Sequence, residues 1–323
     1  MQSQPDAQMI TDTVNKIVSE VEKVIVGKRK VITRAVIAIL CEGHVLLEDV
    51  PGLGKTMLAR SLAAAVGGSF SRVQFTPDLL PTDITGAMVF DPRTAEFSYR
   101  EGPVVTNILL ADEINRAGPR TQSSLLEAME ERQVSVERHS VQLPRPFFVI
   151  ATQNPVELEG TFPLPEAQLD RFLMRLSIGY PEVEDEREML RRFRENTPLQ
   201  TVDTVVSTDE MMALIASVRH IRISEVVEGY LLDIIRATRA DEMLDVGASP
   251  RAALALARAS QAYAASEGRD YVLPDDVREM APDVLAHRLL ATAQAELLGT
   301  TQAEIVARIV ESISVPVETG NVV

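Results

Sequence analysis

Several residue types are rare or missing in this chain, and each shortage excludes a class of protein. Among its 323 residues there is no tryptophan, the aromatic residues make up 4%, and Cys41 is the single cysteine. One cysteine cannot form an internal disulfide, so Cys41 is expected to be a small buried residue in its apolar stretch. With so few aromatic side chains, a stacking platform for nucleic-acid bases is disfavoured.

Long apolar runs and an excess of basic charge are also lacking. The run from Ala35 to Cys41 ends at Glu42, well short of the ~18 residues that a membrane-spanning helix needs. The opening residues, MQSQPDAQM, have neither a basic start nor a following apolar core, so no signal peptide is predicted and the cytoplasm is the expected compartment. The net charge is −15. Because proteins that bind nucleic acid usually carry a basic face, this acidity favours a protein partner over a nucleic acid.

The pattern of apolar residues indicates an α/β fold. Short apolar runs alternate with helical patterns, which predicts a doubly wound parallel sheet covered on both faces. The predicted strands are 44–47, 71–75, 107–111, 147–152 and 173–178. Two stretches, 86–102 and 133–143, alternate apolar and polar residues around turn signals, near Asp91 and near Arg138–Ser140, and are predicted to be inserted hairpins.

The second part of the chain has a different character. After Tyr180 a charge-dense helix and a polar linker at 196–207 lead into a run of helical patterns that continues to the end. We therefore predict an α/β nucleotide-binding domain over residues 1–195, with a leading helix and two hairpin insertions. A small all-α lid domain is predicted over residues 196–323.

The strongest functional signal is the segment from Asp49 to Thr56, DVPGLGKT, which follows an apolar strand and opens a helix. Glycines let successive backbone N–H groups turn toward phosphate oxygens, and the N-terminus of the helix attracts negative charge. Lys55 is expected to reach the β- and γ-phosphates, and Thr56 to supply a hydroxyl to Mg²⁺. The first position of this P-loop pattern is Asp49 instead of glycine, which leaves a chance loop as the alternative. The predicted contacts are Pro51, Gly52, Leu53, Gly54, Lys55, Thr56 and Met57.

Two further strands end in polar residues. Asp112 and Glu113 follow one apolar strand, where the first could hold Mg²⁺ and the second could polarise an attacking water. The alternative is that the pair caps a helix. Asn154 ends the next strand and could hold the same water, although an amide there is often a turn residue.

Other polar residues carry weaker signals. The acidic residues Glu127, Glu130 and Glu131 are expected to lie on a solvated helix face. The four histidines are too scattered to suggest a metal site beyond Mg²⁺ bound with the nucleotide.

The order of these motifs resembles that of the AAA+ ATPases over nearly the whole chain. The set is completed by Leu169-Asp170-Arg171-Phe172 and Ser249-Pro250-Arg251. The segments LLEDVPGLGKT, LLADEINRAGPRTQSSLLEAMEERQVSV and VIATQNPVELEGTFPLPEAQLDRF resemble the MoxR family, in the branch with an insert in helix 2.

This resemblance implies roles for single residues. Asn154 would be the first sensor, Arg171 an arginine finger that reaches the nucleotide of the neighbouring subunit, and Arg251 a second sensor in the lid. Val26 and Gly27 would lie near the adenine. The alternatives are a salt bridge of Arg171 with Asp170 or another carboxylate, a solvated helix start at Arg251, and a simple turn between helices at 26–27.

The resemblance also implies an activity and partners. It implies a Mg²⁺-dependent ATPase that assembles into a ring, expected to be a hexamer, and that activates or matures protein complexes in a chaperone-like way. A protein with a von Willebrand A domain is the expected partner, and the client is not identified. A chelatase-type motor subunit and an AAA+ DNA-remodelling motor are the alternatives within the class, and a nucleotide-gated binding module without hydrolysis is the alternative to an enzyme. The acidity counts against the DNA motor, and the presence of Glu113 and Arg171 counts against the binding module.

Overall fold

The structure is a computed structural model that describes residues 7–136, 139–154, 160–195 and 198–316. The chain forms two compact units. The α/β unit comprises Thr13–Phe172 and Leu176–Met212, and the helical unit comprises Met1–Asp12, Leu173–Arg175 and Ala213–Val323. Within the described residues, no helix is long and apolar enough to cross a lipid bilayer.

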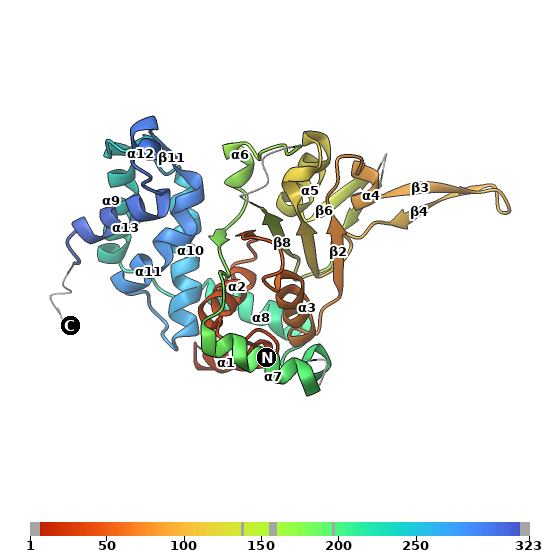
Figure 1. Cartoon of the computed structure of the whole chain (residues 1–323), viewed down its shortest axis with the longest axis horizontal. Coiled ribbons are helices and arrows are strands. Elements are labelled where there is room, and N and C mark those ends of the chain that lie inside the picture. The colour runs from red at the N-terminus through yellow and green to blue at the C-terminus, as the bar shows by residue number, and fades with distance from the viewer. Residues whose placement is uncertain (1–6, 137–138, 155–159, 196–197, 317–323) are drawn as a thin grey trace. The chain divides into compact units, whose positions relative to one another are not determined.

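The α/β unit is built on a five-stranded sheet with the order β2-β5-β8-β1-β9, of which β2 and β8 are labelled in Figure 1. The pairs β1–β8, β5–β8 and β2–β5 are all parallel. The strands are β1 (Val45–Glu48), β2 (Phe70–Gln74), β5 (Ile108–Asp112), β8 (Phe148–Gln153) and β9 (Met174–Leu176). The predicted doubly wound parallel sheet is therefore confirmed, and each strand lies within a residue or two of its predicted position.

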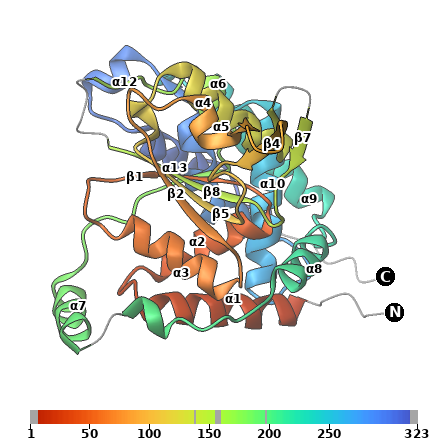
Figure 2. The ribbon, with the colours of Figure 1, turned by 90° about the vertical axis from the view of Figure 1, so that its right-hand side faces the viewer.

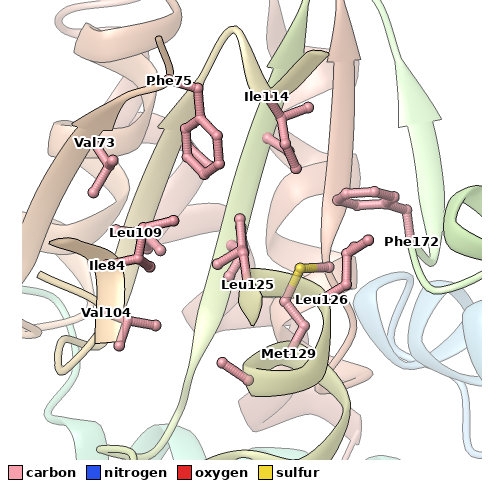
Figure 3. Packing of buried hydrophobic residues seen from close by; sticks show 14 of the residues in the cluster. Val73, Phe75, Ile84, Val104, Leu109, Ile114, Leu125, Leu126, Met129 and Phe172 are labelled. Atoms are coloured by element: carbon pink, nitrogen blue, oxygen red, sulfur yellow. The ribbon is translucent and has the colours of Figure 1, made fainter. Parts of the chain in front are cut away.

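Helices cover both faces of this sheet, with α2 and α3 on one side and α4 and α5 on the other (Figure 2). These helices are α2 (Arg29–Leu40), α3 (Lys55–Ala65), α4 (Pro81–Thr85) and α5 (Pro119–Glu131). Because side chains alternate along a strand, Leu109 and Ala111 of β5 face α5 and pack with its Leu125 and Met129 (Figure 3). Strand β5 thus rests on a buried apolar core.

Both inserted hairpins are present. Strands β3 (Gly86–Asp91) and β4 (Glu96–Glu101) pair in an antiparallel register, as do β6 (Gln133–Val136) and β7 (His139–Gln142). The first turn is closed by the N–H of Ala95, which donates to the carbonyl of Asp91. The predicted second turn near Arg138–Ser140 falls partly outside the described residues, which omit Arg138.

The helical unit contains α9 (Glu225–Ala240), α10 (Pro250–Ser266), α11 (Pro274–Leu285), α12 (Ala293–Leu297) and α13 (Gln302–Ser312). It also contains a short antiparallel pair, β10 (Leu244–Val246) with β11 (Leu290–Ala291), which the all-α prediction did not include. The hydroxyls of Ser249 and Thr301 cap α10 and α13 by accepting backbone N–H groups. Further α-helices among the described residues are α1 (Ala7–Glu22), α6 (Glu166–Leu169), α7 (Val183–Glu195) and α8 (Thr208–Val218).

The division between the units differs from the predicted boundary at 195/196. The linker after α7 is bonded to the α/β unit, because the N–H of Val205 and the hydroxyl of Thr204 donate to the carbonyls of Ala65 and Ala64. The N–H of Asp203 donates to Glu20 in the same way. These bonds keep the chain with the α/β unit as far as Met212. The stretch was predicted to be a polar linker, and the N–H groups of Asp203, Val205 and Val206 in it are hydrogen-bonded within the α/β unit.

Candidate functional site

The loop between β1 and α3 has the geometry of an anion-binding loop. Gly52 and Gly54 have φ values of +90° and +83°, a left-handed region that glycine enters at little cost. Gly54 is the N-cap of α3, so the loop leads directly into the N-terminus of an 11-residue helix. Unpaired N–H groups and the helix dipole make this end attractive to a phosphate group.

Asp49, at the unusual first position of the loop, anchors the loop to the chain that follows β9. Its carboxylate is buried and accepts hydrogen bonds from the hydroxyl of Ser177 at 2.7 Å and from the N–H groups of Ile178 and Gly179 at 2.7 and 3.0 Å. A glycine could not make these bonds. The departure from the usual pattern therefore has a structural explanation, which the sequence did not reveal.

Lys55 lies over the loop and close to three carboxylates. Its ammonium group donates to the backbone carbonyl of Asp49 at 2.5 Å. Burial lowers the pKa of Lys55, while the negative charges of Asp49, Asp112 and Glu113 oppose that change. The structure thus brings Lys55 together with the two acidic residues that follow β5.

Asp112 and Glu113 are held in place at the end of β5. The carboxylate of Asp112 accepts from the hydroxyl of Thr152 at 2.7 Å and from the guanidinium of Arg72 at 2.6 Å. The backbone N–H of Glu113 donates to the same hydroxyl of Thr152 at 2.8 Å. A single side chain on β8 therefore fixes both acidic residues.

Glu113 adopts a backbone conformation that non-glycine residues rarely use, with φ +56°. Its carboxylate accepts from the amide of Gln74 at 2.8 Å and from the guanidinium of Arg116 at 3.0 Å. Strained residues concentrate at functional sites, where the surrounding contacts maintain them. Gln74 and Arg72 contact these acidic residues, although no local sequence pattern pointed to them.

An apolar pocket of about 410 Å³ adjoins the loop. Its walls come from the α1–α2 connection, from the loop glycines, from the segment between β9 and α7, and from α7 itself; they include Val26, Gly52, Gly54, Tyr180 and Leu190. Its volume is within the range of small-molecule sites. Gly27, between the lining residues Val26 and Lys28, has φ +71°, and a Cβ there would meet the carboxylate of Asp185 at 1.8 Å.

The remaining predicted residues lie on several elements. Asn154 is buried directly after β8. Arg171 lies between α6 and β9, where its Nε atom is 3.2 Å from a carboxylate oxygen of Glu130. Glu130 is exposed, as expected for a solvated helix face, and its carboxylate also pairs with this arginine. Arg251 lies in the first turn of α10 in the helical unit.

The residues present suit a magnesium ion bound with a phosphate ligand. Thr56 follows Lys55 in the first turn of α3, and Asp112 is close enough to alter the pKa of Lys55. A hydroxyl and a carboxylate are the hard oxygen donors that Mg²⁺ prefers, and it usually takes only one or two of them together with substrate phosphates and water. Thr56 and Asp112 are the residues that could hold it.

Comparison with known proteins agrees with this geometry. Residues 44–174 match the family described as "ATPase family associated with various cellular activities (AAA)", and residues 236–309 match the AAA lid domain. The "Uncharacterized protein YeaC" of Bacillus subtilis is 48% identical over 303 residues, which cover 94% of this chain and 95% of that protein. The "Chaperone MoxR1" of Mycobacterium tuberculosis is 42% identical over 313 residues, which cover 94% of this chain and 82% of that protein. A crystal structure of a candidate ATPase from Cytophaga hutchinsonii, 39% identical, matches with a TM-score of 0.90 over 96% of this chain and 97% of the other.

Proposed function

Because this chain belongs to the MoxR family of AAA+ ATPases, we propose that it hydrolyses ATP in a ring of identical subunits and thereby activates or remodels partner proteins. The observation that carries this proposal is the group formed by the glycine loop, Lys55, Asp112 and Glu113 at one edge of the sheet.

ATP would bind with its phosphates at the N-terminus of α3. Lys55 would exchange the carbonyl of Asp49 for the β- and γ-phosphates, which offer it a stronger, charged acceptor. The adenine would occupy the apolar pocket beside Val26 and Gly27, and Pro51, Leu53 and Met57 complete the proposed contacts with the nucleotide.

The hydrolytic step would depend on residues at the ends of β5 and β8. Mg²⁺, held by Thr56 and Asp112, would neutralise charge that develops on the phosphate oxygens. Glu113 would accept a proton from the attacking water, and Asn154 would orient that water from the neighbouring strand. Thr152 supports this step by fixing the backbone of Glu113.

Arg171 would act on the nucleotide of the neighbouring subunit. An arginine finger stabilises the charge of the transition state and contributes about 10³-fold or more to the rate. Arg251 would report the state of the nucleotide to the helical unit. Because the finger acts between subunits, hydrolysis should require the ring, which we expect to be a hexamer.

The proposed cellular role is chaperone-like. It is supported by the similarity to a protein named "Chaperone MoxR1". Movement driven by hydrolysis would reach the client through the β3–β4 and β6–β7 hairpins. A von Willebrand A-domain protein is the proposed partner.

The first experiment measures the ATPase rate against protein concentration for the wild type and for Arg171→Ala, with mass photometry to record assembly. We expect the wild-type rate per subunit to rise with assembly, and Arg171→Ala to lose about 10³-fold while it still binds ATP. Arg236→Ala, an exposed arginine on α9, is the matched control and should keep the wild-type rate. A rate independent of concentration, or a fully active Arg171→Ala, would refute the ring and the role given to Arg171.

A further inference from the structure

A second cavity lies in the α/β unit on the side of the two hairpins. It measures about 320 Å³ and is bordered by α4, α5, the start of β3 and the whole of β6. Figure 1 shows β6 beside α4 and α5, and the β3–β4 hairpin extending away from them. The residues of the proposed nucleotide site do not line this cavity.

Two strand edges border the cavity. In the part of the chain that the structure describes, β3 pairs only with β4, and β6 pairs only with β7. Residues 86–88 of β3 and 133–136 of β6 line the cavity. An edge strand directs alternate N–H and C=O groups away from its partner, so both edges can accept the backbone of an added strand.

An apolar face continues from the cavity along the first hairpin. Met88 lines the cavity, and Phe90, two residues further on, lies on the same face of β3. The ring of Phe90 is 5.1 Å from the ring of Phe97 on β4. Phe90 and Phe97 remain 47% and 66% exposed, although their burial would be favourable. This face can therefore receive apolar side chains.

The charge of the cavity narrows the choice of occupant. Among the residues that line it, Glu127 of α5 is the one with a charged side chain, and it is exposed. A carboxylate at this place attracts a lysine or arginine and repels a phosphate backbone. The lining therefore favours a polypeptide over a nucleic acid.

We propose that this cavity and the Met88–Phe90–Phe97 face bind an extended segment of a client protein by strand addition. The segment carries alternate apolar side chains and a basic residue opposite Glu127. This inference rests on the proposed function, because it assigns a binding surface to the client on which the ATPase would act.

The test uses a fluorescein-labelled, capped decapeptide that alternates valine with lysine or threonine, with fluorescence anisotropy as the readout and no nucleotide added. We expect saturable binding with a Kd of about 10–100 µM. Phe97→Ser should weaken binding about fivefold through lost apolar contact, and Glu127→Gln about threefold through lost charge. Methylation of alternate backbone nitrogens of the peptide should abolish binding, because it removes the donors that strand addition needs.

Matched controls separate this site from unspecific attraction. Glu131→Gln makes the same change of charge one turn further along α5, at an exposed residue outside the cavity lining, and should bind as the wild type does. Equal binding of the methylated peptide, equal effects of Glu131→Gln and Glu127→Gln, or no saturable binding up to 1 mM peptide overturns the proposal. Loss of binding when the subunits assemble would mean that another copy covers the surface, which also overturns it.

The outcome is distinguishable from a failure of the proposed function. Peptide binding without ATPase activity would contradict only the enzymatic role, and ATPase activity without peptide binding would contradict only this surface. The basal ATPase rate of the control variant Glu131→Gln should equal the wild-type rate.

Discussion

Replacing Asp49 by alanine should destabilise the α/β unit, although Asp49 occupies a position where the usual P-loop has glycine. The carboxylate of Asp49 accepts three hydrogen bonds, from Ser177, Ile178 and Gly179, and so connects the loop after β1 with the chain after β9. Alanine removes all three hydrogen bonds at once.

The size of the effect follows from the exposure of the three donors. The hydroxyl of Ser177 and the N–H of Gly179 belong to residues that water can reach, whereas Ile178 is 5% exposed. A buried N–H without an acceptor costs about 1–3 kcal/mol, and each hydrogen bond to a charged group contributes about 1.5–3 kcal/mol where water does not replace it. We therefore expect Asp49→Ala to lower the free energy of unfolding by about 3–4 kcal/mol.

Urea denaturation followed by circular dichroism measures this difference. Ser177→Ala is the matched control, because it removes one exposed donor and should cost about 1 kcal/mol or less. In the Asp49→Ala background the same Ser177→Ala change should cost almost nothing, since its acceptor is already gone. A loss below about 1 kcal/mol for Asp49→Ala would refute the view that this carboxylate anchors the loop.

Two further predictions concern buried ionisable groups elsewhere in the chain. Burial lowers the pKa of His44 from 6.5 to about 4, and its ring accepts the N–H of Val149 at Nδ1, so the folded state favours the neutral form. This contribution to stability is complete above pH 6.5 and is lost as the pH falls toward 4. Between these pH values the free energy of unfolding, measured by urea titration, should therefore fall by about 3 kcal/mol more in the wild type than in His44→Gln. Equal pH profiles of the two proteins would contradict this prediction. In the helical unit, Arg269→Ala leaves the carboxylate of Asp276, 3% exposed, without its guanidinium partner and should cost about 3 kcal/mol. Arg222→Ala, which breaks an exposed pair with Asp270, should cost less than about 1 kcal/mol, and similar losses in both variants would contradict the argument from burial.

The sheet could be predicted from the sequence because a strand buried on both faces is a continuous apolar run between polar residues. The apolar runs at 107–111 and 147–152 are such cases, and they correspond to β5 and β8 of the structure. The pair β10–β11 was missed because strands of three and two residues are too short to show a period. The end of α11 at Leu285 is equally hard to predict, because the apolar residues after it belong to a 3₁₀ turn and to β11, and composition alone does not separate these from a helix.

The candidate site could be predicted only where its residues are adjacent in sequence. The loop with Lys55, and the pair Asp112 and Glu113, are short motifs whose order along the chain carries the signal. Contacts across strands depend on the register of the sheet, which pairs Gln74 with Asp112 and so brings the Gln74 amide to Glu113. No local pattern encodes that register, and Gln74 was therefore not predicted.

The contact between Arg171 and Glu130 leads to a last prediction, because an arginine bound within its own subunit must first be released to act on a neighbour. The two side chains are 29% and 39% exposed, and an ion pair with this exposure contributes about 0–1 kcal/mol. A finger that accelerates hydrolysis by about 10³-fold supplies about 4 kcal/mol, so the ion pair is too weak to prevent its action. Glu130→Gln should therefore change the ATPase rate of the assembled protein by less than about fivefold, whereas Arg171→Ala should abolish it. Equal and severe losses in both variants would mean that the Arg171–Glu130 pair is a structural element of the subunit and that the finger must be sought elsewhere.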